Sequence, residues 1–153
     1  MPSVTFPQAE LQRQGPLVDV KFSISTELEK KYSEQKIELP PAIVGKALID
    51  TGASISIVER TIPEKLGLKP VGVTKMMTAS AKDVECYQYY MKLVMINLSP
   101  PAAAPHQELY FEGLFTAMPL EGQNISCLIG RDILQKGILI YIGYADQFTL
   151  SLL

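Results

Sequence analysis

The chain has 153 residues, a length that fits a single domain with a sizeable core. Hydrophobic residues make up 47% and charged residues 20% of it, as in an ordinary globular protein. The net charge is −2 and no basic run occurs, so we expect no nucleic-acid partner. Neither a long apolar run nor a signal-peptide pattern occurs, so we expect no membrane span and a cytoplasmic protein, or a domain of a longer one.

The pattern of polar and apolar residues changes twice within the N-terminal third of the chain. Residues 1–16 mix polar residues with prolines, and we expect a loosely held arm that precedes a domain over residues 17–153. Apolar residues alternate with polar ones from Val18 to Ile24, which predicts a half-buried strand. The charged residues 26–36 predict either an exposed helical turn or a hairpin excursion. Residues 42–49 then predict a buried strand that ends at Asp50.

The middle of the chain predicts a long hairpin. Residues 55–58 continue as strand, and residues 59–66 predict a short helix that ends with Gly67 at its C′ position. Residues 71–78 and 84–98 predict two strands, joined by a mobile tip of small and charged residues. One face of the second strand carries a stripe that we expect in the core rather than around a cofactor: Tyr87, Tyr89, Met91, Leu93 and Met95.

The C-terminal third predicts further strands. The proline-containing residues 99–106 predict a loop, and residues 109–117 predict a strand in which Gly113 is a candidate bulge. Residues 133–137 predict a short helix that ends at a glycine, and residues 137–144 and 147–152 predict a final hairpin. With about seven to nine strands and two or three short helices, the chain is expected to form a mostly β domain, barrel-like or sandwich-like.

Several chemistries lack the residues that they require. His106 is the sole histidine and lies in the proline-containing loop, so a Ser-His-Asp or Cys-His site would have to be built there. Cys86 and Cys127 lie far apart and form no C-x-x-C pair, so we expect two buried free thiols and no disulfide framework. No cluster of metal ligands and no phosphate-binding loop occurs, so we expect neither a metal nor a cofactor.

Acid–base chemistry by carboxylates remains, and Asp50 is the candidate. It ends an apolar run and precedes Gly52, where the backbone can turn sharply. These residues alone are equally compatible with a capped strand end, because Asp and Gly are common in turns. A pair that activates water needs two carboxylates, which share one proton because both do not ionise easily. No second Asp-Thr-Gly or Asp-Ser-Gly occurs, so the partner must be Asp50 of another subunit across a twofold axis.

Two motifs together carry a resemblance to a known family. Asp50-Thr51-Gly52-Ala53-Ser54 after an apolar strand, with Leu128-Ile129-Gly130-Arg131-Asp132 near the C-terminus, resembles the retropepsin group of aspartic proteases, above all the retropepsin-like domains of bacteria and retroelements. The likeness covers about residues 40–153. It implies a closed, barrel-like acid-protease fold with short helices and one lobe per chain. It also implies a homodimer that hydrolyses peptide bonds in extended polypeptide segments, with a shared-proton pair of the kind known from aspartic proteases.

The resemblance implies a role for each motif residue. Asp50 would be the catalytic aspartate, Thr51 would bond its counterpart in the other subunit, and Gly52 would let the substrate backbone approach. Ala53 and Ser54 would complete the support of the active site, and Gly130, Arg131 and Asp132 would hold the active-site loop and the dimer. The hairpin over residues 76–84 would be the flap that covers the peptide, with a substrate-binding tip made of Met77, Thr78, Ala79, Ser80 and Ala81.

Some features depart from the family pattern. The flap tip has no glycine, and Ser54 stands where retroviral members often place an aspartate that pairs with the arginine matching Arg131. Arg131 then needs another acceptor, either a backbone carbonyl or Asp132. The alternative function is a catalytically weak or inactive dimeric module for binding or regulation. Arg131 and Asp132 could equally just begin a helix, and the C-terminal strand 148–152 is either core or, as we favour, part of an intersubunit sheet.

Overall fold

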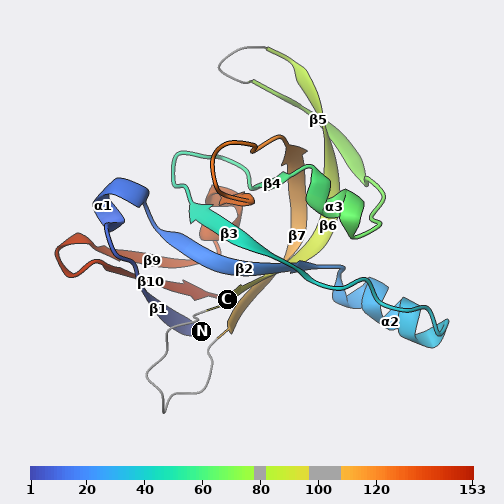
Figure 1. Ribbon diagram of the computed structural model, residues 1–153, viewed down its shortest axis with the longest axis horizontal. Helices are drawn as coiled ribbons and strands as arrows, with labels where there is room; N and C mark the ends of the chain where they lie inside the picture. The colour runs from blue at the N-terminus through green and yellow to red at the C-terminus, as the bar shows by residue number, and fades with distance from the viewer. Residues whose placement is uncertain (78–81, 97–107) are drawn as a thin grey trace.

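The structure, a computed structural model, describes residues 1–77, 82–96 and 108–153. It is mostly β, with 48% of the residues in strands and 18% in helices, and its centre is a closed barrel of six strands accompanied by short helices. Figure 1 shows three parts that extend from this centre: a long hairpin, a helix, and a small sheet near both chain ends. In the described part of the chain, no helix is both long and apolar enough to cross a bilayer.

The barrel is a ring in which every strand has two neighbours. Its strands follow one another in the order β2 (Leu17–Ser23), β3 (Ile43–Ile49), β8 (Cys127–Ile129), β4 (Ile57–Glu59), β7 (Glu108–Met118) and β6 (Val84–Ile96). Antiparallel pairing of β6 with β2 closes the ring, while β3–β8 and β4–β7 are parallel pairs. A closed ring leaves no exposed strand edge. The first half of β6 continues beyond the ring and pairs with β5 (Gly72–Met76), which forms the projecting hairpin in Figure 1.

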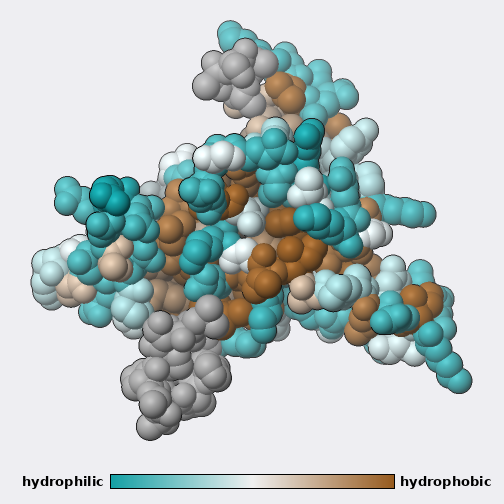
Figure 2. Space-filling view, in the orientation of Figure 1, coloured by the Kyte–Doolittle hydropathy of each residue, from teal (hydrophilic) through white to brown (hydrophobic). Residues whose placement is uncertain are grey.

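Alternating side chains of the ring fill its interior. Buried residues come from every wall, among them Phe22 of β2, Ile49 of β3 and Phe115 of β7. The stripe expected on β6 is buried at Tyr89, Met91, Leu93 and Met95, whereas Tyr87 is 57% exposed. Tyr87 differs because it lies in the projecting part of β6, where it pairs with Val73 rather than with a barrel strand. Figure 2 shows hydrophobic residues gathered near the centre of the face in view, over the barrel.

The chain ends form a second, three-stranded sheet in the order β1 (Ser3–Pro7), β10 (Gln147–Leu152) and β9 (Gly137–Ile142), called the terminal sheet below. Phe6 of β1 is buried and stacks on Phe148 of β10, with the ring centroids 5.2 Å apart. The short helix α1 (Leu11–Gln14) buries Leu11 completely. The expectation of a loosely held arm over residues 1–16 was therefore wrong. The partner of this segment lies at the other end of the sequence, where no local pattern reveals it.

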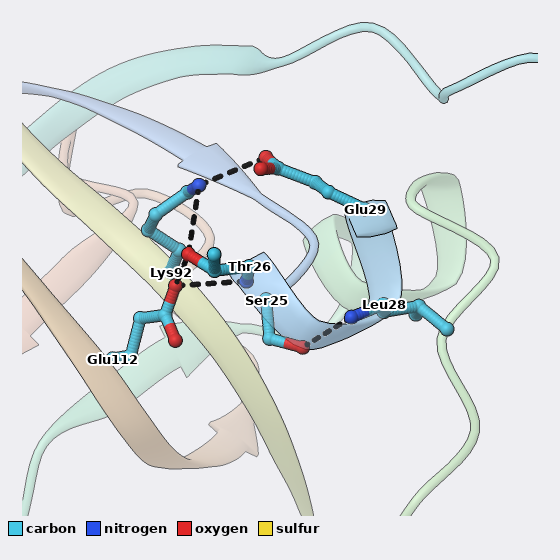
Figure 3. A network of polar contacts seen from close by, with 6 residues as sticks. All are labelled: Ser25, Thr26, Leu28, Glu29, Lys92 and Glu112. Atoms are coloured by element: carbon cyan, nitrogen blue, oxygen red, sulfur yellow. Dashed lines mark hydrogen bonds and ion pairs between the residues drawn. The ribbon is translucent and has the colours of Figure 1, made fainter. Parts of the chain in front are cut away.

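The remaining helices are short: α2 (Thr26–Glu34), α3 (Thr61–Lys65), α4 (Arg131–Leu134) and the 3-10 helix η1 (Gly143–Ala145). Residues 26–34 are thus helical, which decides between the two alternatives left open for this segment. The helix α2 has no buried residue and is fastened through polar contacts, drawn in Figure 3. The Lys92 ammonium lies 2.8 Å from Glu29, and the Glu112 carboxylate accepts a hydrogen bond of 2.8 Å from the Thr26 N–H. A carboxylate at a helix N-terminus is favoured by the helix dipole.

Of two predictions made for glycines, one is confirmed and the other is wrong. Gly67 has a φ of +68°, the left-handed conformation expected of a C′ residue, so this prediction is confirmed. Gly113 forms no bulge, because the β6–β7 register runs unbroken through the pair Met91 and Gly113. A Cβ at Gly113 would lie 2.5 Å from the Phe111 ring, so the missing side chain makes room for that ring. The structure has ten strands in its described part, more than expected from the sequence.

Candidate active site

Asp50 lies where β3 leaves the barrel wall. Its N–H donates to the Ile129 carbonyl over 2.9 Å, which extends the β3–β8 pairing one residue beyond the strand. Its Oδ1 accepts a hydrogen bond of 2.9 Å from the Gly52 N–H, and its carbonyl accepts one of 3.2 Å from the Ala53 N–H. The half-buried carboxylate is therefore tied to a tight turn of its own backbone. The sequence prediction of a turn directly after a buried strand is confirmed.

The second motif holds this turn in place. The Arg131 N–H donates to the Ala53 carbonyl over 2.9 Å, and the Arg131 Nη1 donates to the Thr51 carbonyl over 2.7 Å. Position 54 is a serine and not an aspartate, so two other acceptors were considered for Arg131, a backbone carbonyl and Asp132. The side chain bonds the backbone carbonyl. The guanidinium is exposed and fixes the turn from outside. Ala53 and Arg131 are 78 positions apart in the chain (131 − 53), yet their two motifs form one local unit.

A buried hydroxyl, missed by the sequence analysis, joins the same two segments. Ser56 is 1% exposed; its Oγ donates to Asp132 Oδ1 over 2.7 Å and accepts from the Gly130 N–H over 3.0 Å. Its N–H donates to Asp132 Oδ2 over 2.9 Å. Asp132 also accepts from the Ile133 N–H in the first turn of α4, so it both supports this helix and ties the motifs together. The signal in the sequence was a small hydroxyl residue between Ile55 and Ile57, since a buried hydroxyl needs partners.

Close backbone contact explains the glycine of the second motif. A Cβ on Gly130 would lie 2.6 Å from the backbone carbon and oxygen of Ile55, closer than a side chain tolerates. Gly130 is buried, and any larger residue would push the two segments apart. We call residues 50–56 and 130–132 the motif corner. Its hydrogen bonds and its glycine make it a single rigid unit.

An apolar row runs across the outside of the barrel beside the motif corner. Strand pairing aligns Leu17 with Leu48, Leu48 with Leu128, and Leu128 with Ile57. All four residues are half-buried, and they lie on the face opposite the core residues of the same strands. Because side chains alternate along a strand, Asp50, two residues beyond Leu48, leaves β3 on this same face. The acid therefore lies at the end of a floor of aliphatic side chains.

A cavity of about 900 Å³ opens at the far end of the row. Leu128 and Ile57 form its floor, and both strands of the β5–β6 hairpin border it, with Met76 on one and Val84 on the other. Further lining residues are Cys86, Tyr87, Tyr89, Ala117, Met118 and Leu120. Asp50 is not among the lining residues, so the cavity adjoins the acid along the apolar row rather than containing it. Its size and apolar lining are those of a ligand site.

Both thiols are buried and free, as expected. Burial raises the pKa of the Cys86 thiol, which borders the cavity. Burial raises the pKa of the Cys127 thiol as well, and the nearby Asp132 charge adds to the effect. A thiol with a raised pKa stays protonated and is a poor nucleophile at neutral pH. Chemistry through these cysteines is therefore disfavoured.

The predicted site residues fall into three groups. Residues 50–54 come together with Gly130, Arg131 and Asp132, as described above. Met77, at the end of the first hairpin strand, is 76% exposed, while the flap residues Thr78, Ala79, Ser80 and Ala81, like His106, lie outside the described residues. Among the described residues no group of three or more His, Cys, Asp or Glu side chains is arranged to hold a metal ion.

The C-terminal strand has a neighbouring strand on each side within its own chain. Residues 147–152 form β10, which lies between β1 and β9 in the terminal sheet and so has no free edge. Phe148 and Leu150 of this strand are completely buried.

A scan against protein-family models and a search of curated proteins each find no match to this chain. The features that bear on function are therefore the motif corner, the apolar row and the cavity.

Proposed function

We propose that this protein is an aspartic endopeptidase with a retropepsin-like fold, active as a homodimer in which two Asp50 carboxylates activate one water molecule. The observation that carries the proposal is the motif corner. A carboxylate at the end of a buried strand is oriented by the Gly52 N–H, and its turn is held by Arg131 and Asp132 of the second motif. A capped strand end alone would not need that second segment.

The chemistry follows from two such carboxylates that share one proton. The unprotonated carboxylate takes a proton from the water as the water oxygen attacks the peptide carbonyl carbon. The protonated carboxyl donates its proton to the carbonyl oxygen. The carboxyl that took the water proton then donates it to the leaving amine as the C–N bond breaks, and the new acid's hydroxyl proton returns to the pair. The hydrogen bond from the Gly52 N–H to Asp50 Oδ1 keeps each carboxyl in a fixed orientation throughout.

The surroundings of Asp50 suit an extended peptide. The apolar row supplies a floor beside the acid, and the cavity at its end offers room for a large apolar side chain. A peptide that lies as a strand between this floor and the β5–β6 hairpin presents alternate side chains to the protein. Arg60, Glu64 and Glu85 also line the cavity and place charges around the apolar lining.

Asp50→Asn tests the proposal, because the amide is nearly isosteric with the carboxyl but does not exchange protons in the same way. We expect cleavage of a peptide library, followed by mass spectrometry, to fall by about 10²–10⁴-fold. Asp19→Asn is the matched control: it removes only an exposed ion pair with Lys46 and is expected to leave cleavage unchanged. Undiminished cleavage by Asp50→Asn would refute the proposal.

A transition-state mimic of the statine type separates this proposal from the alternative of an inactive binding module. The active dimer is expected to bind the mimic, and Asp50→Asn to bind it more weakly. Activity is also expected to fall toward alkaline pH, because one carboxyl of the pair has to keep its proton. A wild-type protein that neither cleaves peptides nor binds the mimic, yet forms a dimer, would favour the binding module.

A further inference from the structure

The strand β9 is an unprotected sheet edge. It lies at one side of the terminal sheet, and its sequence Gly-Ile-Leu-Ile-Tyr-Ile has no charged residue and no proline. Three of its apolar side chains are about half exposed: Ile138 at 54%, Ile140 at 50% and Tyr141 at 49%. Natural proteins usually protect an exposed edge with charges, prolines or bulges, because its free N–H and C=O groups pair readily with another strand. An edge of this kind is typical of an assembly surface.

Two other edge strands in the described part of the chain carry features that protect a free edge. At the opposite side of the terminal sheet, β1 is short, ends at Pro7 and carries Ser3 and Thr5 at its non-core positions. At the open end of the larger sheet, β5 contains Lys75. Both devices discourage pairing with further strands. Only β9 combines a free edge with an entirely apolar sequence.

The edge lies close in the chain to the motif corner. The helix α4 begins with Arg131, whose side chain binds the Thr51 carbonyl, and β9 starts three residues after that helix ends. The helix and β9 also pack against each other. A partner that docks on β9 is therefore connected through one short, packed segment to the turn that carries Asp50.

We propose that β9 is the intersubunit strand, which pairs antiparallel with β9 of a second copy across a twofold axis. The result is one continuous six-stranded sheet in the order β1-β10-β9-β9′-β10′-β1′. A twofold axis places a strand antiparallel to its own copy, which is the geometry that sheet pairing needs. Because β9 carries no charge, the copy meets no like-charge repulsion. This inference rests on the proposed function, in which Asp50 of a second copy completes the active site.

Ile140→Lys tests the interface, and Val44→Lys is its matched control. Both residues are exposed β-branched aliphatics, but Val44, at 70% exposure, lies on β3 of the barrel, where it pairs with Lys21 of β2, and not in the terminal sheet. In sedimentation equilibrium we expect Ile140→Lys to weaken the dimer by at least about tenfold, because two lysines would face each other across the axis. Val44→Lys is expected to leave it unchanged. Equal dimerisation of both variants would overturn the inference.

Single cysteines keep the test decisive if Ile140→Lys does not fold. Each of the residues 138–141 is replaced by Cys in turn and the protein is oxidised; Cys86 and Cys127 are buried and give little background. We expect a disulfide-linked dimer at the one or two positions nearest the axis, where Cα atoms come within about 4.4–6.8 Å. Linkage at none of them in a dimeric protein places the interface elsewhere.

Dimerisation and peptide cleavage, measured separately, distinguish this inference from the proposed function. If Asp50→Asn dimerises through β9 and the wild-type protein does not cleave peptides, the interface stands and the protease proposal fails. If wild type cleaves peptides and Ile140→Lys remains a fully active dimer, the protease proposal stands and β9 is not the interface.

Discussion

The barrel and the terminal sheet differ in how their sheets end: the barrel closes on itself, and the terminal sheet has a free edge. In the barrel, pairing of β2 with β6 closes the ring, and the strand ends that carry the two motifs are locked within one chain. In the terminal sheet, β9 stays open and apolar. The barrel therefore fixes the geometry of each Asp50 within one chain, and in the dimer that we propose the open sheet brings two such acids together. In that dimer, rigidity and assembly depend on different parts of the molecule.

The two regions also differ in what their polar side chains pair with. In the barrel the buried Ser56 hydroxyl pairs with the half-buried Asp132 carboxylate inside the motif corner. In the terminal sheet hydroxyls pair with each other across neighbouring strands, Ser3 with the buried Ser151 and Thr5 with Thr149. A buried polar network is costly to break because each lost partner leaves a desolvated group unpaired. Substitutions in the two regions are therefore expected to act by different mechanisms.

The largest expected effect is on packing in the terminal sheet. Phe148 is completely buried and stacks on Phe6, so Phe148→Ala is expected to lower the free energy of unfolding by about 3–5 kcal/mol. Ile138→Ala, on the exposed side of the same sheet, should cost less than about 1 kcal/mol in the monomer. Urea unfolding at low protein concentration measures both. Equal effects would mean that the terminal sheet is not packed on the barrel core.

The next effect is on the polar network of the motif corner. Asp132→Ala removes the acceptor of the Ser56 N–H, the Ser56 hydroxyl and the Ile133 N–H, and is expected to cost about 3 kcal/mol. Asp19→Ala removes an exposed ion pair on the same barrel and should cost at most about 1 kcal/mol. Chemical denaturation provides the comparison. If Asp132→Ala were as mild as the control, the network would not hold the two motifs together.

Local pattern predicted the barrel strands well. The alternation from Val18 to Ile24, the apolar run that ends at Asp50 and the stripe on β6 each reflect burial of residues two apart, which a single segment records. The left-handed Gly67 was likewise predictable, because the need for glycine arises from its own backbone angle. Turn and strand signals of this kind need no knowledge of the partner segment.

Long-range pairing explains the rest. The strand β1 is ordered by β10, with Ser3 and Ser151 separated by 148 positions, and Ser56 is satisfied by Asp132, 76 positions away. The alternation in β1 spans only five residues next to prolines, so this segment was expected to be a loose arm. The pairing of Ser56 leaves no periodic trace in its own segment and was missed. The C-terminal strand is a further case: its sequence is that of an edge or a core strand, and only its neighbours β1 and β9 show that it is not an edge strand of its own chain.

The smallest expected effect is a pH dependence that comes mainly from Cys127, which lies in β8 of the barrel wall. Burial raises the pKa of Cys127 above its ordinary value of 9.0, so above pH 9 the unfolded chain releases a proton that the folded chain keeps. The unfolded state then binds fewer protons, and the free energy of unfolding falls as the pH rises, by at most about 1.4 kcal/mol per pH unit for one thiol. Cys86 acts in the same direction, and below pH 9 neither thiol contributes a slope.

Cys127→Ala isolates this contribution, because every other titratable side chain is the same in the two proteins. We expect the stability of wild type, measured by urea unfolding between pH 8 and pH 10.5, to decline more steeply than that of the variant, with a difference of about 1 kcal/mol at the upper end. Phe148→Ala, which leaves Cys127 in place, is expected to keep the wild-type slope at lower overall stability. Parallel curves for wild type and Cys127→Ala would show that the thiol is not held protonated in the barrel wall, and the closed ring would then admit more water than its packing implies.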